Sequence, residues 1–225
     1  MTDVTLKLPD DSSMPCHKLL LIAASPFFET MFQSGMKESV DQVVELKFSD
    51  ADTIRMLVEF IYSGEIDVNK DNVRTIIAAS EFLLLKDLKA HCENFIVGTT
   101  NSSNCIQNMK FGRKFNLEKL ISTANQFMVL HFEETLAAPE FNSLTEAELR
   151  EVVSNDQLNV EKEDVVFHAV VGWVNADLEQ RKEAFPRIAP LIRFPFCSPE
   201  TLNGVVGREP LMWNHECMKL LTEAQ

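Results

Sequence analysis

The stretch "HKLLLIAASPFFETMFQSG", residues 17–35, predicts two helices joined at a tight corner, and the rest of the chain is interpreted around it. Its first part is almost entirely apolar and consists of good helix formers, which predicts a buried helix. Ser25 and Pro26 fit a helix cap followed by a proline in the first turn, and they open the helix "FFETMFQS". Gly35 ends this second helix, because glycine is common just beyond helix C-termini.

Short strand patterns surround this helical pair. Residues 4–8, "VTLKL", alternate apolar and polar, and the turn "PDDSS" then leads into "MPCH", which predicts a β-hairpin. Residues 43–48, "VVELKF", and 65–68, "EIDV", predict two more strands. Residues 50–64 and 70–97 follow helical spacing. The first hundred residues therefore predict an α+β domain, with few strands and many helices.

A polar segment, "GTTNSSN" at residues 98–104, is the best candidate for a domain boundary. It divides the chain into predicted domains 1–98 and 99–225. Only helical patterns follow it, and Thr145 with Glu148 fits a capping box at the start of one of them. The second domain is therefore predicted to be all-α, as a helical bundle or a helical repeat, although no similarity between its segments is visible.

Composition excludes several classes of function. The net charge of −13 disfavours nucleic-acid binding, which depends on Lys and Arg neutralising phosphates. No apolar run approaches the roughly 18–20 residues of a membrane span. The five cysteines lack zinc spacing, and no secretory signal is visible, so we expect reduced thiols in a cytoplasmic or nuclear protein. Motifs typical of catalysis, metals and cofactors are absent, which favours a protein that binds other proteins.

Several motifs in the first domain occur together in one known family. They are "DVTL", "HKLLLIAASPFF", "SGMKES", "FIYSGEI" and "DLKAHC". In this order they resemble a BTB (POZ) domain along its whole length. The helical segments after the boundary resemble a BACK domain, with a leading helical pair at about 104–132 that is similar to the three-box. The pairing of these domains is similar to the kelch-like proteins, which are substrate adaptors of cullin-3 ubiquitin ligases.

The resemblance implies a cullin contact in the turn after the second helix. In that family this turn carries a hydrophobic residue, any residue and a glutamate, and Met36-Lys37-Glu38 fits the pattern. A flexible methionine side chain held out of a polar turn is suited to filling a groove on a partner. The alternative is that Met36 folds back on its own domain and Glu38 is merely solvated. With the resemblance, we favour the cullin contact.

Three aromatic residues have two interpretations each. The family places Tyr62 at the cullin-facing surface, but a helix-end tyrosine half buried against the core fits the sequence equally well. Phe111 and Phe115 lie one helical turn apart in the segment that resembles the three-box. They either line the cullin groove or belong to the core, and we favour the core.

The expected function is therefore a non-catalytic adaptor that binds the cullin-3 N-terminal domain, with no metal or cofactor. Family members carry a helix and a strand before "DVTL", and without them we expect weakened self-association. No kelch repeats are visible in this chain, so a decoy that occupies the cullin without a substrate stays open. A further alternative is a BTB-mediated oligomerisation or corepressor-recruiting module that binds no cullin.

Overall fold

The computed structural model describes residues 2–33 and 42–224, which form two compact units. The first unit contains Met1–Thr99 and Gly112–Leu120, and the second contains Thr100–Phe111 and Ile121–Gln225. Two helices near the predicted boundary contribute residues to both units. The bounds 1–98 and 99–225 therefore stay a prediction, while the succession of an α+β unit and a helical unit is confirmed.

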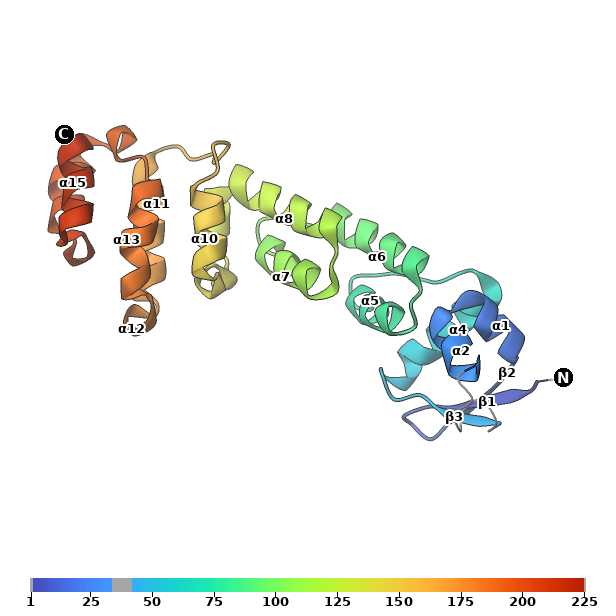
Figure 1. Cartoon of the computed structure of the whole chain (residues 1–225). Coiled ribbons are helices and arrows are strands. Elements are labelled where there is room, and N and C mark those ends of the chain that lie inside the picture. Colours follow the sequence, from blue (N-terminus) through green and yellow to red (C-terminus); the bar gives the residue numbers. More distant parts are fainter. Residues whose placement is uncertain (1, 34–41, 225) are drawn as a thin grey trace. The chain divides into compact units, whose positions relative to one another are not determined.

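The first unit combines a small mixed sheet with helices (Figure 1). Strand β1 lies in the middle, antiparallel to β2 and parallel to β3, so that Leu6 stands opposite Met14 on one side and Val44 on the other. The predicted hairpin and the strand after it are therefore confirmed. The elements are β1 (Val4–Lys7), β2 (Ser13–Cys16), α1 (Lys18–Ala24), α2 (Pro26–Gln33), β3 (Val43–Glu45), α4 (Ala51–Ser63), α5 (Val73–Phe82) and α6 (Lys86–Gly98).

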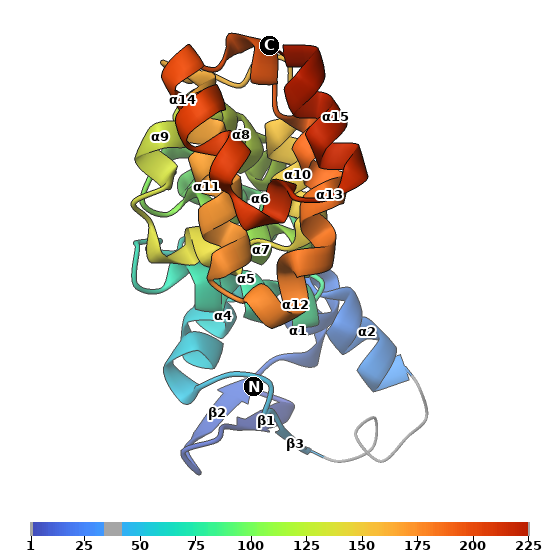
Figure 2. The same ribbon diagram turned by 90° about the vertical axis from the view of Figure 1, so that its left-hand side faces the viewer.

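The core of the first unit lies between the sheet and its helices. Side chains of a strand alternate between its two faces, and on the inner face Val4, Leu6 and Val44 are buried. Figure 2 shows the three strands gathered beside α1, α2 and α4 of this unit. The helices contribute the fully buried side chains Leu21, Phe28, Ile54, Leu57, Ile76 and Ile77 to the same core. The sheet and the helices thus share one hydrophobic core.

Two details of the first unit differ from the sequence-based expectations. Helix α1 is not a buried helix, because Leu21 is its one buried residue while Leu19 and Leu20 are 75% and 43% exposed. An apolar run is buried all round only when partners cover every face, and within the unit α1 packs mainly against α2 and α4. Residues 65–68 form no strand, and no other described segment pairs with them.

Helix α8 receives its N-terminal cap from another helix of the first unit. The residue before it, Leu117, has no side-chain oxygen that accepts a hydrogen bond. The buried carboxylate of Glu93 in α6 takes over this role and accepts the backbone N–H of Leu120 at 3.0 Å. Lys119 also donates to the side chain of Asn94 at 3.2 Å. The start of α8 is therefore held by side chains of α6.

The second unit is helical throughout its described part and has its own core. The predicted capping box is confirmed, because Thr145 Oγ1 accepts the N–H of Glu148 and Glu148 accepts the N–H of Thr145. Helices α7 (Cys105–Phe115) and α8 (Glu118–Leu130) lead into it. The α-helices that follow are α9 (Phe132–Thr135), α10 (Glu146–Val153), α11 (Glu163–Asn175), α12 (Leu178–Arg181), α13 (Phe185–Ile188), α14 (Pro199–Gly204) and α15 (His215–Ala224). Short 3-10 helices connect them at Pro139–Ser143, Lys182–Ala184, Ala189–Leu191, Phe194–Phe196, Val206–Arg208 and Pro210–Met212.

Trp173 of α11 is a buried residue of the second unit with several polar contacts. Its indole N–H donates to the carbonyl of Leu144 at 2.9 Å. The guanidinium of Arg181 lies over the ring at 4.2 Å and donates to the Trp173 carbonyl at 2.7 Å. The side chain is only 2% exposed, so these contacts are shielded from water. Trp173 therefore joins three segments of the chain.

Candidate protein-binding site

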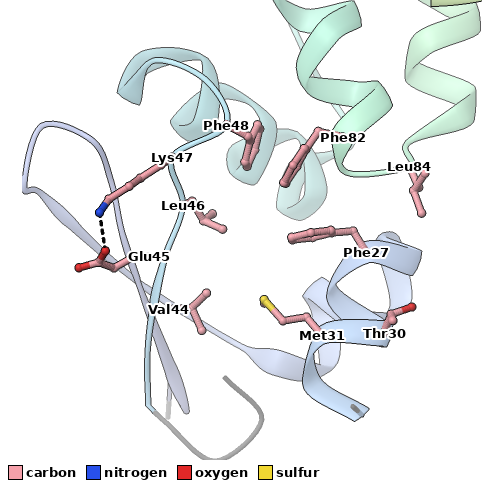
Figure 3. A pocket seen from close by; sticks show the side chains of 10 residues that line it. All are labelled: Phe27, Thr30, Met31, Val44, Glu45, Leu46, Lys47, Phe48, Phe82 and Leu84. Atoms are coloured by element: carbon pink, nitrogen blue, oxygen red, sulfur yellow. Dashed lines mark ion pairs between the residues drawn. The ribbon is translucent and has the colours of Figure 1, made fainter. Parts of the chain in front are cut away.

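The first unit has an open, largely apolar pocket of about 530 Å³ (Figure 3). It lies where α2, β3 with the residues after it, and the end of α5 meet. Its lining residues are Phe27, Thr30, Met31, Val44, Glu45, Leu46, Lys47, Phe48, Phe82 and Leu84. An apolar concavity on a protein surface commonly marks the place where another molecule binds.

Aromatic rings form one wall of this pocket. The ring of Phe82 stacks on Phe48 with centroids 4.3 Å apart, and it meets Phe27 at 4.8 Å. Figure 3 shows these three rings side by side. Phe82 remains 45% exposed, so the stack presents apolar surface to solvent. Exposed aromatic residues of this kind are frequent anchors in protein–protein interfaces.

Glu45 and Lys47 belong to the segment that lines the pocket, but their side chains point away from it, as Figure 3 shows. Lys47 Nζ lies 2.7 Å from the carboxylate of Glu45, and Lys7 lies 3.8 Å from it. The hydrogen bond and charge of Lys47 lower the pKa of Glu45 below its usual value, so this carboxylate is ionised at neutral pH. This ion pair therefore lies on the opposite side of the segment from the apolar pocket.

The predicted cullin-binding turn connects two elements that line the pocket. Helix α2 carries Met31 and ends at Gln33, and β3, which carries Val44, begins shortly after residue 41. Met36 and Glu38 belong to the connecting segment 34–41 and lie outside the described residues. Their predicted contact with a partner stays a prediction.

Tyr62 lies at the end of α4, beside the start of α1. Its hydroxyl accepts the backbone N–H of His17 at 2.7 Å and lies 3.0 Å from Nδ1 of the same residue. Next to it, the carboxylate of Asp3 accepts the N–H of Lys18 at 2.8 Å. The ring is 42% exposed and does not line the aromatic pocket. The structure therefore gives Tyr62 a role in holding the start of α1, and its predicted role at a cullin surface stays a prediction.

Phe111 and Phe115 are half-buried residues of helix α7. Phe111 belongs to the second unit and Phe115 to the first. The ammonium of Lys114 lies 5.3 Å from the ring centroid of Phe115. Neither phenylalanine is among the fully buried core residues, and the assignment to a cullin groove stays a prediction.

The aromatic pocket itself was not identified from the sequence. A signal for Phe82 does exist, because α5 buries Val73, Ile76 and Ile77 while Phe82 lies off this stripe. An aromatic residue outside the buried stripe of a helix must either face solvent or meet another element. Long-range packing determines which elements Phe82 contacts. The sequence therefore did not indicate that Phe27 and Phe48 would lie against it.

The described residues offer little support for metal or nucleophilic chemistry. No group of three or more His, Cys, Asp or Glu side chains within residues 2–33 and 42–224 is arranged to hold a metal ion. All five cysteines are free and buried. Burial raises the pKa of Cys92 to about 11, and burial with the nearby Asp164 charge raises that of Cys197 to about 12. These two thiols are therefore protonated at neutral pH and poor nucleophiles.

No helix within the described part of the chain is long and apolar enough to span a membrane.

Comparison with known proteins gives matches along nearly the whole chain. The BTB/POZ domain family matches residues 1–100, and the family "BTB And C-terminal Kelch" (BACK) matches residues 105–207. Kelch-like protein 25 of Mus musculus is 32% identical over 223 residues, which are 99% of this chain and 38% of that protein. Kelch-like protein 2 of Mus musculus is 33% identical over 225 residues, covering 100% of this chain and 38% of that protein.

The chain thus spans well under half the length of these relatives. Among solved structures, the BTB domain of human Gigaxonin is 32% identical and has a TM-score of 0.38, covering 42% of this chain and 76% of that one.

Proposed function

Because this chain belongs to the kelch-like family of BTB–BACK proteins, we propose that it binds the N-terminal domain of cullin-3 as a non-catalytic adaptor. The contact would involve the turn with Met36 and Glu38, the aromatic pocket and the helical pair that resembles the three-box. In a ubiquitin ligase such a subunit acts by proximity. It raises the effective concentration of a bound protein near the ligase, and no chemistry of its own is needed.

The observation that carries this proposal is the position of the aromatic pocket. Its walls include Met31 and Val44, which flank segment 34–41 in the sequence. An interface needs a central apolar anchor with polar groups around it. The stacked rings supply such an anchor.

We expect calorimetric titration of the chain with the cullin-3 N-terminal domain to show one-to-one binding. Met36→Asp and Glu38→Lys should each weaken this affinity at least about tenfold, which is the usual effect of changing a central interface residue. Aspartate places an unpaired charge in a desolvated contact, and lysine replaces an acceptor by a cation. Met218→Asp is the matched control, because Met218 is a 42% exposed methionine of α15 in the other unit.

The control should bind like the unmodified chain. If the unmodified, folded chain binds no cullin domain, the adaptor assignment is wrong and the alternative of an oligomerisation or corepressor-recruiting module takes its place. If it binds but both turn variants bind equally well, the adaptor assignment stands and the turn is not the contact.

A second proposal concerns self-association through α1. Leu19 and Leu20 present apolar surface on this helix, with Leu19 75% exposed. We expect the chain to show a monomer–dimer equilibrium in sedimentation, and Leu19→Asp to raise its dissociation constant at least about tenfold. A chain that is monomeric at all concentrations, or a variant that dimerises unchanged, would contradict this role of α1.

A further inference from the structure

The first unit contains a second pocket, of about 440 Å³, whose lining is more polar than that of the aromatic pocket. It lies where the end of α5, the N-terminal half of α6 and the turn between α7 and α8 meet. Its lining residues are Ser80, Glu81, Leu84, Lys86, Lys89, Ala90, Glu93, Asn116 and Leu117. All of them belong to the first unit, so the pocket is a feature of one compact unit.

A sharp corner between α5 and α6 brings two polar residues to this pocket. Leu84 at the corner has a φ angle of +57°, in the left-handed region, and the N–H of Leu85 donates back to the carbonyl of Ser80 at 2.9 Å. The last turn of α5 therefore lies beside the first turn of α6. Ser80 from the one and Lys86 from the other line the same pocket.

The hydroxyl of Ser80 is an unused hydrogen-bonding group in the pocket wall. The residue is 0% exposed, and its hydroxyl has no hydrogen-bond partner among the described residues. A serine within a helix commonly donates to the carbonyl one turn back, and Ser80 does not. Because buried polar groups are nearly always satisfied, this hydroxyl points to an atom that occupies the pocket.

The carboxylates of the pocket are already engaged, whereas one cation is not. Glu81 accepts a hydrogen bond from the ammonium of Lys89 at 2.5 Å. Glu93 accepts the backbone N–H of Leu120 at 3.0 Å. The ammonium of Lys86 has no ion-pair partner among the residues that the structure describes. The pocket therefore has a positive charge and a hydroxyl available to a ligand.

Helix α6 begins beside the pocket without a side-chain cap. Its N-cap residue is Leu85, and both neighbours of that residue line the pocket. The N-terminus of such a 13-residue helix carries a partial positive charge from its unbonded N–H groups. Asp87 lies in the first turn of α6 but is not a lining residue. A hydroxyl, an ammonium and a helix N-terminus at one pocket together favour a negatively charged oxygen.

We propose that this pocket binds a small organic oxyanion, a carboxylate or a phosphate monoester with an apolar body. The ammonium of Lys86 neutralises the charge, and the hydroxyl of Ser80 donates one hydrogen bond to an anionic oxygen. The apolar body contacts three lining side chains, Leu84, Ala90 and Leu117. Both groups left over in the free protein then have a partner. The site is a property of the first unit and does not depend on binding of a cullin.

NMR titration of the whole chain with three probes of similar size tests this site. Pentanoate and butyl phosphate carry the two oxyanions, and pentylammonium carries the opposite charge on the same kind of body. We expect saturable shifts of the Ser80, Lys86 and Leu117 amide signals with at least one oxyanion and none with pentylammonium. The oxyanion that binds more tightly is the class that the pocket prefers.

Variants of the two polar residues test their roles. Lys86→Gln should lower the affinity for the oxyanion at least about tenfold, whereas Lys86→Arg keeps the charge and should bind like the unmodified chain. Ser80→Ala should lose about tenfold, the usual effect of removing a hydrogen bond to a charged group. Lys182→Gln is the matched control, because Lys182 is an exposed lysine of the second unit.

Stability in the absence of any probe gives an independent readout. Ser80→Ala removes a buried hydroxyl without a partner and introduces a better helix former, so its urea midpoint should equal or exceed that of the unmodified chain. A lower midpoint would show that the hydroxyl is already satisfied and would overturn the inference. Absence of saturable shifts with both oxyanions, or equal effects of Lys86→Gln and Lys182→Gln, would also overturn it. Each of these results leaves the proposed cullin contact untouched.

Discussion

Replacing Phe82 with glutamate is expected to weaken binding of the cullin-3 N-terminal domain about a hundredfold, as for a central aromatic anchor. Phe82 lies in the middle of the stacked rings, between Phe27 and Phe48. A carboxylate at this point must either lose its hydration in the complex or keep water in the centre of the interface, and both weaken binding. Calorimetric titration measures this loss directly.

The fold should survive this change. Phe82 is 45% exposed, so we expect its replacement to lower the free energy of unfolding by less than about 2 kcal/mol, below the cost of a core cavity. Phe196→Glu is the control, because Phe196 is a 75% exposed phenylalanine of the second unit. Equal affinity of the Phe82 variant and the unmodified chain would show that the aromatic pocket is not part of the cullin contact.

Replacing Trp173 with alanine is expected to destabilise the second unit by about 3–5 kcal/mol, the usual cost of removing a large buried aromatic side chain. The change leaves a cavity and removes the donor to Leu144 and the ring beneath Arg181. Urea denaturation followed by circular dichroism measures the loss. Trp173→Phe keeps most of the ring volume, so it should cost less and report mainly the lost hydrogen bond.

The second tryptophan of the chain supplies the control. Trp213 is 67% exposed, so Trp213→Ala should change the free energy of unfolding by no more than about 0.5 kcal/mol, the usual range for surface substitutions. A Trp173→Ala protein as stable as the Trp213→Ala protein would contradict the assignment of Trp173 as a core anchor.

Local signals predicted much of the fold. Asp50 and Gly64 mark the two ends of α4 in the sequence, and in the structure Asp50 accepts the N–H of Thr53 while Gly64 adopts a left-handed conformation. The hairpin and the capping box could also be predicted from the sequence, because each depends on residues close together in the chain. Elements with such nearby determinants were predicted correctly.

Features that depend on distant residues were not predicted. The apolar run of α1 gave no sign that Leu19 would face solvent, because helical pattern alone does not show how many faces are covered. The left-handed end of α5 was also hidden, since its sequence "FLLLK" lacks the glycine or asparagine that marks such ends. For the candidate site, Met36 and Glu38 were found by family resemblance, whereas the aromatic pocket required the packing of three separate elements.

The cap that Glu93 provides to α8 has a consequence for how this part of the chain unfolds. A helix capped by the residue before it keeps that hydrogen bond as a local contact. The cap of α8 instead comes from a carboxylate of α6, 27 residues before Leu120 in the chain. When α6 unfolds, the N–H of Leu120 loses this acceptor, so one side chain couples the first turn of α8 to the integrity of α6.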